Sequence, residues 1–405
     1  DLFLREQTEE GILKPVVTRD IYSMINGVPM GTQPVSMYPH WTERWDGEDK
    51  TSWLWVAQKG GQGAIDISGS SYKQEGILSQ MFLSKSYPEG FVSVGVIDMQ
   101  FLTMAIGEDG TIYTRVKDSN LLFNSSNFLD RPLTSDKEGK IKVDGSMIAY
   151  APFDEHGGMV LYDKNSAQYL HIADYKNWQG YNYSGKVLPL KVEEYEYGPS
   201  DARLDNMKDY SVYFVGASLV DWGDISYMSI IKDKAGKFYM QKFKVEAYGG
   251  GSSVTKVGAS FISQSEIKGL DAVIDGTSKN CFYLCRNQDK APYLFISKGE
   301  TLYFYYTDGN KLYTCAQFDS PIASIDAECF NNKYIIVGLE SGDVFILKGE
   351  DDNSDYTLKK YVIQQNKVIQ VTDAENKFVL FHEKDFGKII QVRYKWKESW
   401  NESFS

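Results

Sequence analysis

The 405-residue sequence has few of the residues that build metal sites or disulfide frameworks. It contains only four cysteines and four histidines, and the histidines form neither an HExxH motif nor a close pair, which argues against a histidine-rich metal site. Cys281 and Cys285 lie in a strand-like segment, where roughly 13 Å would separate their Cα atoms, too far for a disulfide. We therefore expect buried free thiols and neither a metal nor another cofactor, while pairing between cysteines of neighbouring strands stays open.

Long apolar runs and an excess of positive charge are also absent. No apolar stretch reaches the ~18–20 residues of a membrane-spanning helix. The net charge of −12, without a stripe of Lys and Arg, would repel a phosphate backbone, so we expect no nucleic-acid partner. The sequence shows no signal peptide and starts without Met, so we interpret it as processed or trimmed. We expect membrane association only through a lipid anchor, which this sequence does not include.

Aromatic residues are abundant, at 14% of the chain, and they favour β structure because they fit a pleated surface. The stretch GEDGTIYTRVK (107–117) shows the pattern. Its first four residues suit a tight hairpin turn, in which Gly and Asp tolerate the backbone angles required. After the turn, apolar and polar side chains alternate with the period of two of a half-buried strand. An apolar run at 101–106 precedes the turn, so the unit is a strand, a hairpin and a second strand.

The same unit recurs along the chain. An apolar strand, a turn, a Gly, a polar residue and an apolar–aromatic pair return, in close or looser form, at 52–68, 159–175, 226–243, 293–318, 334–348 and 378–394. One unit falls about every 52 residues, near the length of a propeller blade. We predict an all-β fold, a β-propeller of about seven four-stranded blades, with six blades as the second choice. A set of sandwich domains is the alternative, and the regular hairpins without clear linkers make it weaker.

We expect residues 1–405 to form a single propeller domain. Residues 1–50 fit the repeat least well, and we expect this N-terminal segment to complete the last blade of a closed ring. Uneven spacing of the repeats indicates inserted loops in the fourth and fifth blades. One insert, at 198–210, has a Ser suited to an N-cap and predicts a short helix.

Two tryptophan-containing regions are candidate ligand sites. Residues 38–55 hold half of the tryptophans, and Trp53 and Trp55 among them read as strand residues that pack between blades. The other two lie in a loop with Gly and Asp, where an exposed indole and a carboxylate suit a sugar ring and its hydroxyls. The second region, DWGD at 221–224 with NWQGYNYSG upstream, has a similar composition, although it reads equally well as a turn with solvated acids. The predicted ligand-binding residues are Trp41, Trp45, Asp46, Trp178, Tyr181, Asp221, Trp222 and Asp224.

No motif identifies a catalytic residue or a metal ligand. The segment DDNSD (351–355) starts like a calcium loop, but Tyr356 stands where that loop requires Gly. The chain has neither a GxSxG motif nor a phosphate-binding Gly loop. Two carboxyl groups at a suitable distance would be enough for glycoside hydrolysis, but with 55 acidic residues in the chain, acidic pairs in the sequence decide nothing.

Two N-terminal segments resemble a known family. The phrase TRDIYSMINGVPMGTQPVSMYP (18–39) and the Trp-rich strand TSWLWVAQKGGQGAIDIS (51–68), followed by irregular repeats, are similar to the PKD-like family lipoproteins of Bacteroidota. The resemblance implies that this chain corresponds to the C-terminal β-propeller-like region, which follows a lipidated Cys and an immunoglobulin-like region in that family. It also implies a place at the outer membrane or cell surface, often beside polysaccharide-uptake proteins. It transfers no catalytic residue.

We therefore expect a non-catalytic binding protein of the cell envelope, at the outer membrane or cell surface, with the periplasmic side as an alternative. Its partner would be a glycan or a surface protein, and its role would be linked to polysaccharide uptake. Two other classes stay open: a glycoside hydrolase or lyase with channel-facing carboxylates, and a structural scaffold of an uptake complex. Converging acids with a perturbed pKa would favour the enzyme, whereas an open aromatic platform would favour the binding protein.

Overall fold

The computed structural model is that of an all-β protein, as predicted. It describes residues 2–7, 13–18, 21–31, 34–41, 52–117, 127–136, 138–150, 158–176, 180, 182–221, 224–246, 256–284, 293–307, 309–327, 334–341, 343–351, 358–363 and 393–394. Besides strands, these residues form α1 (Ile21–Asn26) and three short 3-10 helices, η1 (Leu78–Met81), η2 (Glu194–Glu196) and η3 (Leu270–Ala272). No helix in this part of the chain has the length and apolar character needed to cross a membrane.

The strands form antiparallel meanders that follow one another along the chain. The first meander consists of β3 (Pro34–Trp41), β4 (Ser52–Gln58), β5 (Ile65–Ser68) and β6 (Gln74–Ile77). The second consists of β7 (Ser93–Asp98), β8 (Leu102–Gly107) and β9 (Ile112–Val116). The third consists of β10 (Ile148–Tyr150), β11 (Gly158–Asp163), β12 (Gln168–Ala173) and β13 (Val187–Lys191).

Three more meanders and a terminal sheet complete the order. The fourth meander consists of β14 (Tyr210–Asp221), β15 (Asp224–Asp233), β16 (Phe238–Val245) and β17 (Val257–Glu266). The fifth consists of β18 (Phe282–Leu284), β19 (Tyr293–Lys298), β20 (Thr301–Tyr306) and β21 (Lys311–Gln317). The sixth consists of β22 (Ile322–Ala327), β23 (Tyr334–Leu339), β24 (Val344–Asp351) and β25 (Leu358–Ile363). The terminal sheet joins both chain ends, because β1 (Leu2–Gln7) pairs antiparallel with β2 (Leu13–Thr18) and parallel with β26 (Arg393–Tyr394).

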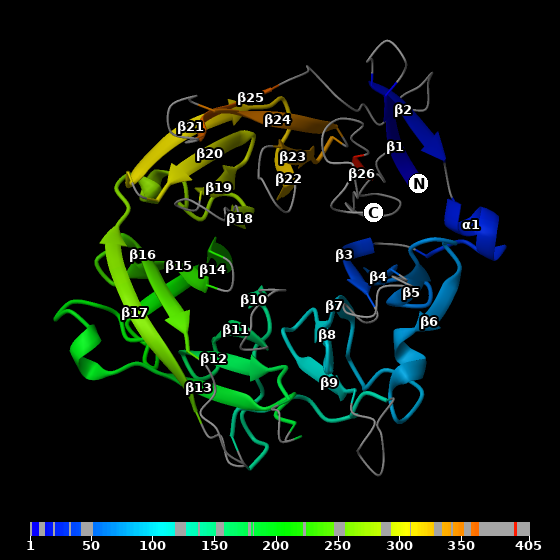
Figure 1. The fold of residues 1–405 in the computed structure, drawn as a ribbon, viewed down its shortest axis with the longest axis horizontal. Helices are drawn as coiled ribbons and strands as arrows, with labels where there is room; N and C mark the ends of the chain where they lie inside the picture. The colour runs from blue at the N-terminus through cyan, green and yellow to red at the C-terminus, as the bar shows by residue number, and fades with distance from the viewer. Residues whose placement is uncertain are drawn as a thin grey trace.

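Figure 1 shows these sheets following one another around a ring, with the first strand of each meander innermost and the last outermost. The third and fourth meanders form one eight-stranded sheet because their outer strands, β13 and β17, pair in parallel. Inner strands of neighbouring meanders also touch. The Ser36 hydroxyl on β3 donates to the Val94 carbonyl on β7 at 2.6 Å, and Phe214 on β14 stacks on Phe282 on β18 with ring centroids 5.3 Å apart.

The hydrophobic core lies between consecutive sheets. Trp55, Phe82, Val96 and Tyr113 belong to a buried cluster between the first and second meanders. Similar clusters fill the contacts between later meanders. A single meander cannot bury its apolar faces alone, and each needs a neighbour to cover them. The repeated unit in the sequence is therefore a consequence of repeated packing around the ring.

The hairpin turn at 107–111 shows why Gly recurs in the repeats. Gly110 has a φ of +82°, a left-handed conformation in which a Cβ is strained. Asp109 accepts hydrogen bonds from the Thr111 amide at 2.9 Å and from its hydroxyl at 2.7 Å. Gly236 has a φ of +89° in the corresponding turn between β15 and β16. Glu108, in contrast, forms an ion pair with Lys59 at the surface.

The insert between β13 and β14 does not form the helix predicted for 198–210. This segment is irregular and is closed by a bridge between Arg203 and Asn206. Leu204 and Met207 are fully buried, and the Leu204 carbonyl accepts a hydrogen bond from the Tyr169 amide at 2.8 Å. Burial of these two side chains is worth more than an N-cap, so tertiary contacts override the local helix signal.

Two further predictions concern tryptophan and cysteine residues. Trp53 and Trp55 lie on β4, and Trp55 is buried between sheets, as predicted. Cys281 and Cys315 are free thiols, as predicted, but they are half-buried and not buried. Cys285 and Cys329 lie outside the described residues.

Candidate functional site

The antiparallel meanders bring distant segments to one face of the ring. Within each meander, the connections after the first and third strands leave from the same end, because consecutive strands alternate in direction. The parallel pairing of β13 with β17 gives the third and fourth meanders the same orientation. The contacts of His40, Asp98 and Asp174 described below show that the first three meanders also have the same orientation. The C-terminal ends of β3, β7, β12 and β14 therefore share one face, which we call the β3–β4 face.

Three of the residues predicted to bind a ligand are described, and they lie at strand ends on this face. The prediction that Trp41 lies in a loop was wrong, because Trp41 is the last residue of β3 and pairs with Ser52 of β4 in the strand register. Asp221 and Asp224 are register partners at the turn between β14 and β15. Their backbone positions are therefore adjacent at one hairpin end. The other predicted residues lie outside the described part of the chain: Trp45, Asp46, Trp178, Tyr181 and Trp222.

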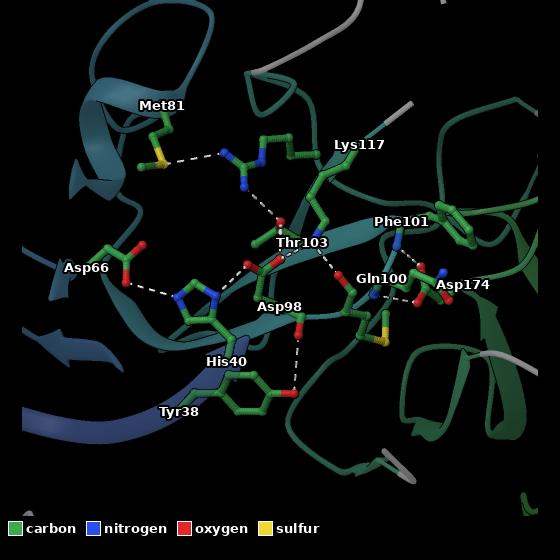
Figure 2. Close-up of polar contacts among 12 residues, drawn as sticks. Tyr38, His40, Asp66, Met81, Asp98, Gln100, Phe101, Thr103, Lys117 and Asp174 are labelled. Atoms are coloured by element: carbon green, nitrogen blue, oxygen red, sulfur yellow. Dashed lines mark hydrogen bonds and ion pairs between the residues drawn. The ribbon is translucent and has the colours of Figure 1, made fainter. Parts of the chain in front are cut away.

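A buried charged cluster on the same face joins the first two meanders (Figure 2). His40 lies near the end of β3, with its Nε2 2.9 Å from Asp66 Oδ1 on β5 and its Nδ1 3.0 Å from Asp98 Oδ2 at the end of β7. The rings of Trp53 and Trp55 stack against the imidazole, with centroids 5.6 and 6.0 Å away. Burial disfavours the charged ring, but the hydrogen bonds and charges of the two carboxylates outweigh it and raise the pKa of His40 to about 9.

Asp98 has further partners on the second meander. Lys117 Nζ lies 2.8 Å from Asp98 Oδ1, and the Thr103 hydroxyl donates to the same oxygen at 2.6 Å. Lys117 also donates to the Met99 carbonyl. Burial acts to raise the pKa of Asp98, but His40 and Lys117 outweigh it and hold that pKa well below its usual range. Asp98 is therefore ionised at neutral pH.

A third carboxylate ties the second meander to the third. Asp174 follows β12, and its two oxygens accept hydrogen bonds from the Gln100 and Phe101 amides at 2.9 and 2.8 Å. These amides belong to the turn between β7 and β8, so the two connections share the β3–β4 face. Burial is the largest influence on Asp174 and raises its pKa to about 6, against the opposing effect of the two hydrogen bonds.

The geometry of this cluster suits a structural link better than acid–base chemistry. A histidine that acts as a general base or as a metal ligand needs a free nitrogen lone pair. Both ring nitrogens of His40 face carboxylate oxygens, and both oxygens of Asp174 accept backbone N–H groups. Across the described residues, no group of three or more His, Cys, Asp or Glu side chains is placed to hold a metal ion.

Sequence reasoning overlooked this cluster, although a signal for it was present. Asp66, Asp98 and Asp174 occur in the otherwise apolar strand segments AIDIS, GVIDM and HIADY. A lone carboxylate in such a segment needs a partner when the strand is buried. The partners could not be assigned, because no sequence spacing links side chains of strands or connections that are far apart in the chain: His40 for Asp66 and Asp98, and the Gln100 and Phe101 amides for Asp174.

Comparison with known proteins assigns no family to this chain. No protein-family model matches the sequence, and no curated protein matches it. The functional conclusion therefore depends on the fold and on the geometry of the β3–β4 face.

Proposed function

We propose that residues 1–405 form a seven-bladed β-propeller in which both chain ends build the last blade. Six meanders and the sheet of β2, β1 and β26 support this proposal, because together they make seven units around the ring of Figure 1. The parallel pairing of Leu4 with Arg393 supports closure of the ring by the N-terminal segment. Propellers host many functions, so this architecture alone assigns none.

We infer that the protein is a non-catalytic binding protein that holds a glycan at the β3–β4 face. One observation carries this inference: two connections with Trp and Asp in their sequences meet the same face, one after Trp41 and one between Asp221 and Asp224. The connection after Asp174, whose sequence contains Trp178 and Tyr181, leaves from that face as well. Aromatic rings offer flat apolar faces, and carboxylates accept hydrogen bonds from hydroxyls, a combination that suits a sugar.

The engagement of the buried acids favours binding over hydrolysis. A glycoside hydrolase needs two carboxyl groups that flank the scissile bond, about 5–9.5 Å apart. On this face, Asp66 and Asp98 are engaged by His40, and Asp174 is engaged by backbone amides. The pKa values of Asp98 and Asp174 are perturbed, as they would be in an enzyme, but burial and the partners of each carboxylate within the protein account for both shifts. Their hydrogen bonds and ion pairs therefore favour a structural role for these acids.

The cell-envelope location and the link to polysaccharide uptake are part of the proposal. They come from the resemblance to the PKD-like lipoproteins of Bacteroidota. In that setting a surface protein is the alternative ligand of the same face. A scaffold role, in contrast, requires no ligand at the β3–β4 face.

A glycan-array screen combined with a reducing-sugar release assay tests the binding proposal. We expect binding to at least one glycan class without release of reducing ends. Trp41→Ala, and separately the double change Asp221→Asn with Asp224→Asn, should weaken that binding about tenfold, the loss of one or two good contacts.

Tyr195→Ala is the matched control for these variants. Tyr195 is 85% exposed, but it lies after the outer strand β13, at the end of the third meander opposite the β3–β4 face. We expect it to leave glycan binding unchanged. Release of reducing sugar would overturn the non-catalytic assignment, and the absence of any glycan binding would replace the glycan by a protein partner or a scaffold role.

A further inference from the structure

We propose that His40 is a link between the first and second meanders that is protonated at neutral pH, and that its deprotonation in alkaline solution opens the contact between β3 and β7. A neutral imidazole has one N–H and one lone pair. Both ring nitrogens of His40 lie within 3.0 Å of a carboxylate oxygen. A lone pair at either position would face the lone pairs of that oxygen, so each nitrogen carries a hydrogen.

The charges around His40 balance only when its ring carries a proton. Lys117 compensates Asp98, and the imidazolium compensates Asp66. Arg115 reaches the cluster indirectly, since its Nη2 donates to the Thr103 hydroxyl at 3.1 Å. The titratable and charged groups that face the cluster are Tyr38 on β3, Asp66 on β5, Asp98 on β7, Arg115 on β9, Lys117 just after β9 and Asp174 after β12.

Loss of the His40 proton would leave a buried carboxylate without a counter-charge. In the described part of the chain, Asp66 is bonded by no cation other than His40. A neutral ring can donate to only one of the two carboxylates, and an unpaired buried charge is strongly destabilising. Two hydrogen bonds between the same strands, from Ser36 to Val94 and from Tyr38 to the Asp98 carbonyl, are expected to break with the link.

The direction of the pKa shift sets the pH range of this opening. The pKa of His40 is raised from 6.5 to about 9 in the folded protein by Asp66 and Asp98, against the effect of burial. Its stabilising contribution is therefore complete below pH 6.5 and is lost as the pH rises through 9. The shift corresponds to proton binding roughly 300-fold tighter in the folded than in the unfolded chain. The link is closed at neutral pH and opens only under alkaline conditions.

Histidine-selective NMR titration tests the protonation state directly. The chain has only four histidines, and the His40→Gln variant assigns the signal. We expect both nitrogens of His40 to be protonated at pH 7.5, with a titration midpoint near 9. A midpoint near 6.5, or a neutral ring beside a protonated carboxyl at pH 7.5, would overturn the proposal.

Hydrogen exchange between pH 7.5 and 10 tests the opening of the contact. The chemical rate of amide exchange itself rises with pH. Exchange of the β3 and β7 amides should rise more steeply than this chemical rate, whereas exchange of the β14 and β15 amides should rise in parallel with it. Asp66→Asn preserves side-chain shape and removes one charge, so it should lower the His40 midpoint by about one pH unit. Because deprotonation of His40 then leaves no unpaired carboxylate, this variant should also reduce the opening seen between pH 9 and 10.

Lys191→Gln is the control for these measurements, because it removes only an exposed ion pair with Glu193. It should change neither the midpoint nor the opening. Identical opening profiles in the wild type and Asp66→Asn would contradict the proposed link. This comparison and the wild-type titration decide the question even if His40→Gln does not fold.

Discussion

Two contacts between neighbouring sheets of this ring are built from different chemistry. Between the first and second meanders, His40 bridges Asp66 and Asp98 beside an apolar cluster. Between the fourth and fifth meanders, Phe214 stacks on Phe282 over buried aliphatic residues of β15 and β19. The charged contact fixes one geometry and responds to pH, whereas the apolar contact responds to the area that it buries. Neighbouring meanders can therefore pack through either charged or apolar contacts, provided that each buried polar group has a partner.

Among changes in these two contacts, removal of the Asp98 side chain is expected to lower the free energy of unfolding the most. Asp98→Ala leaves His40 with one carboxylate and Lys117 with none at this position, so the free energy of unfolding at pH 7 should fall by about 3–5 kcal/mol. Urea denaturation measures this loss. Glu108→Ala is the control, because its exposed ion pair with Lys59 should contribute less than about 0.5 kcal/mol. A similarly small loss for both variants would mean that the charged contact is solvated.

Truncation of a side chain in the apolar contact is expected to lower the free energy of unfolding slightly less than Asp98→Ala. This loss should not depend on pH. Ile296 is fully buried on β19, within the cluster between the fourth and fifth meanders. Ile296→Ala should lower the free energy of unfolding by about 3 kcal/mol, through lost burial and the cavity left behind. Urea denaturation at pH 6.5 and at pH 9.5 should give the same loss. A loss that changes with pH would show that this contact is coupled to charged groups, and the contrast between the two contacts would disappear.

Replacement of Asp174 is expected to have the smallest of the three effects on the free energy of unfolding. Unlike the loss at Ile296, this effect should depend on pH. Burial raises the pKa of Asp174 from 3.8 to about 6, so the folded protein binds this proton more tightly and gains stability as the pH falls from 7 towards 4. Asp174→Asn cannot titrate and should remove about 2 kcal/mol of that gain between pH 7 and 4.5. The quantity to measure is the difference in unfolding free energy between wild type and variant at the two pH values. A difference that does not change with pH would show that the Gln100 and Phe101 amides keep Asp174 ionised.

Local patterns in the sequence encode the repeated part of the fold. Alternation after the turn at 107–111, together with Gly110, was enough to predict the hairpins and the all-β class. The insert at 198–210 was predicted wrongly, because Leu204 and Met207 are held by a core that local sequence does not describe. For the same reason, the sequence identified connections rich in Trp and Asp but not the cluster around His40. That cluster exists only because strand register and sheet order bring β3, β5 and β7 together.

A ring whose last sheet pairs β1 with β26 is complete only after β26 has been synthesised. Leu4 pairs with Arg393, so the whole segment between them must be made before β1 meets β26. At about 5–20 residues per second, the first strands wait roughly 20–80 s for this partner. During that time β1 presents an unpaired edge that is able to pair with another chain. The topology therefore makes the newly made protein vulnerable to exchange of β26 between two copies, a hazard that the finished ring no longer carries.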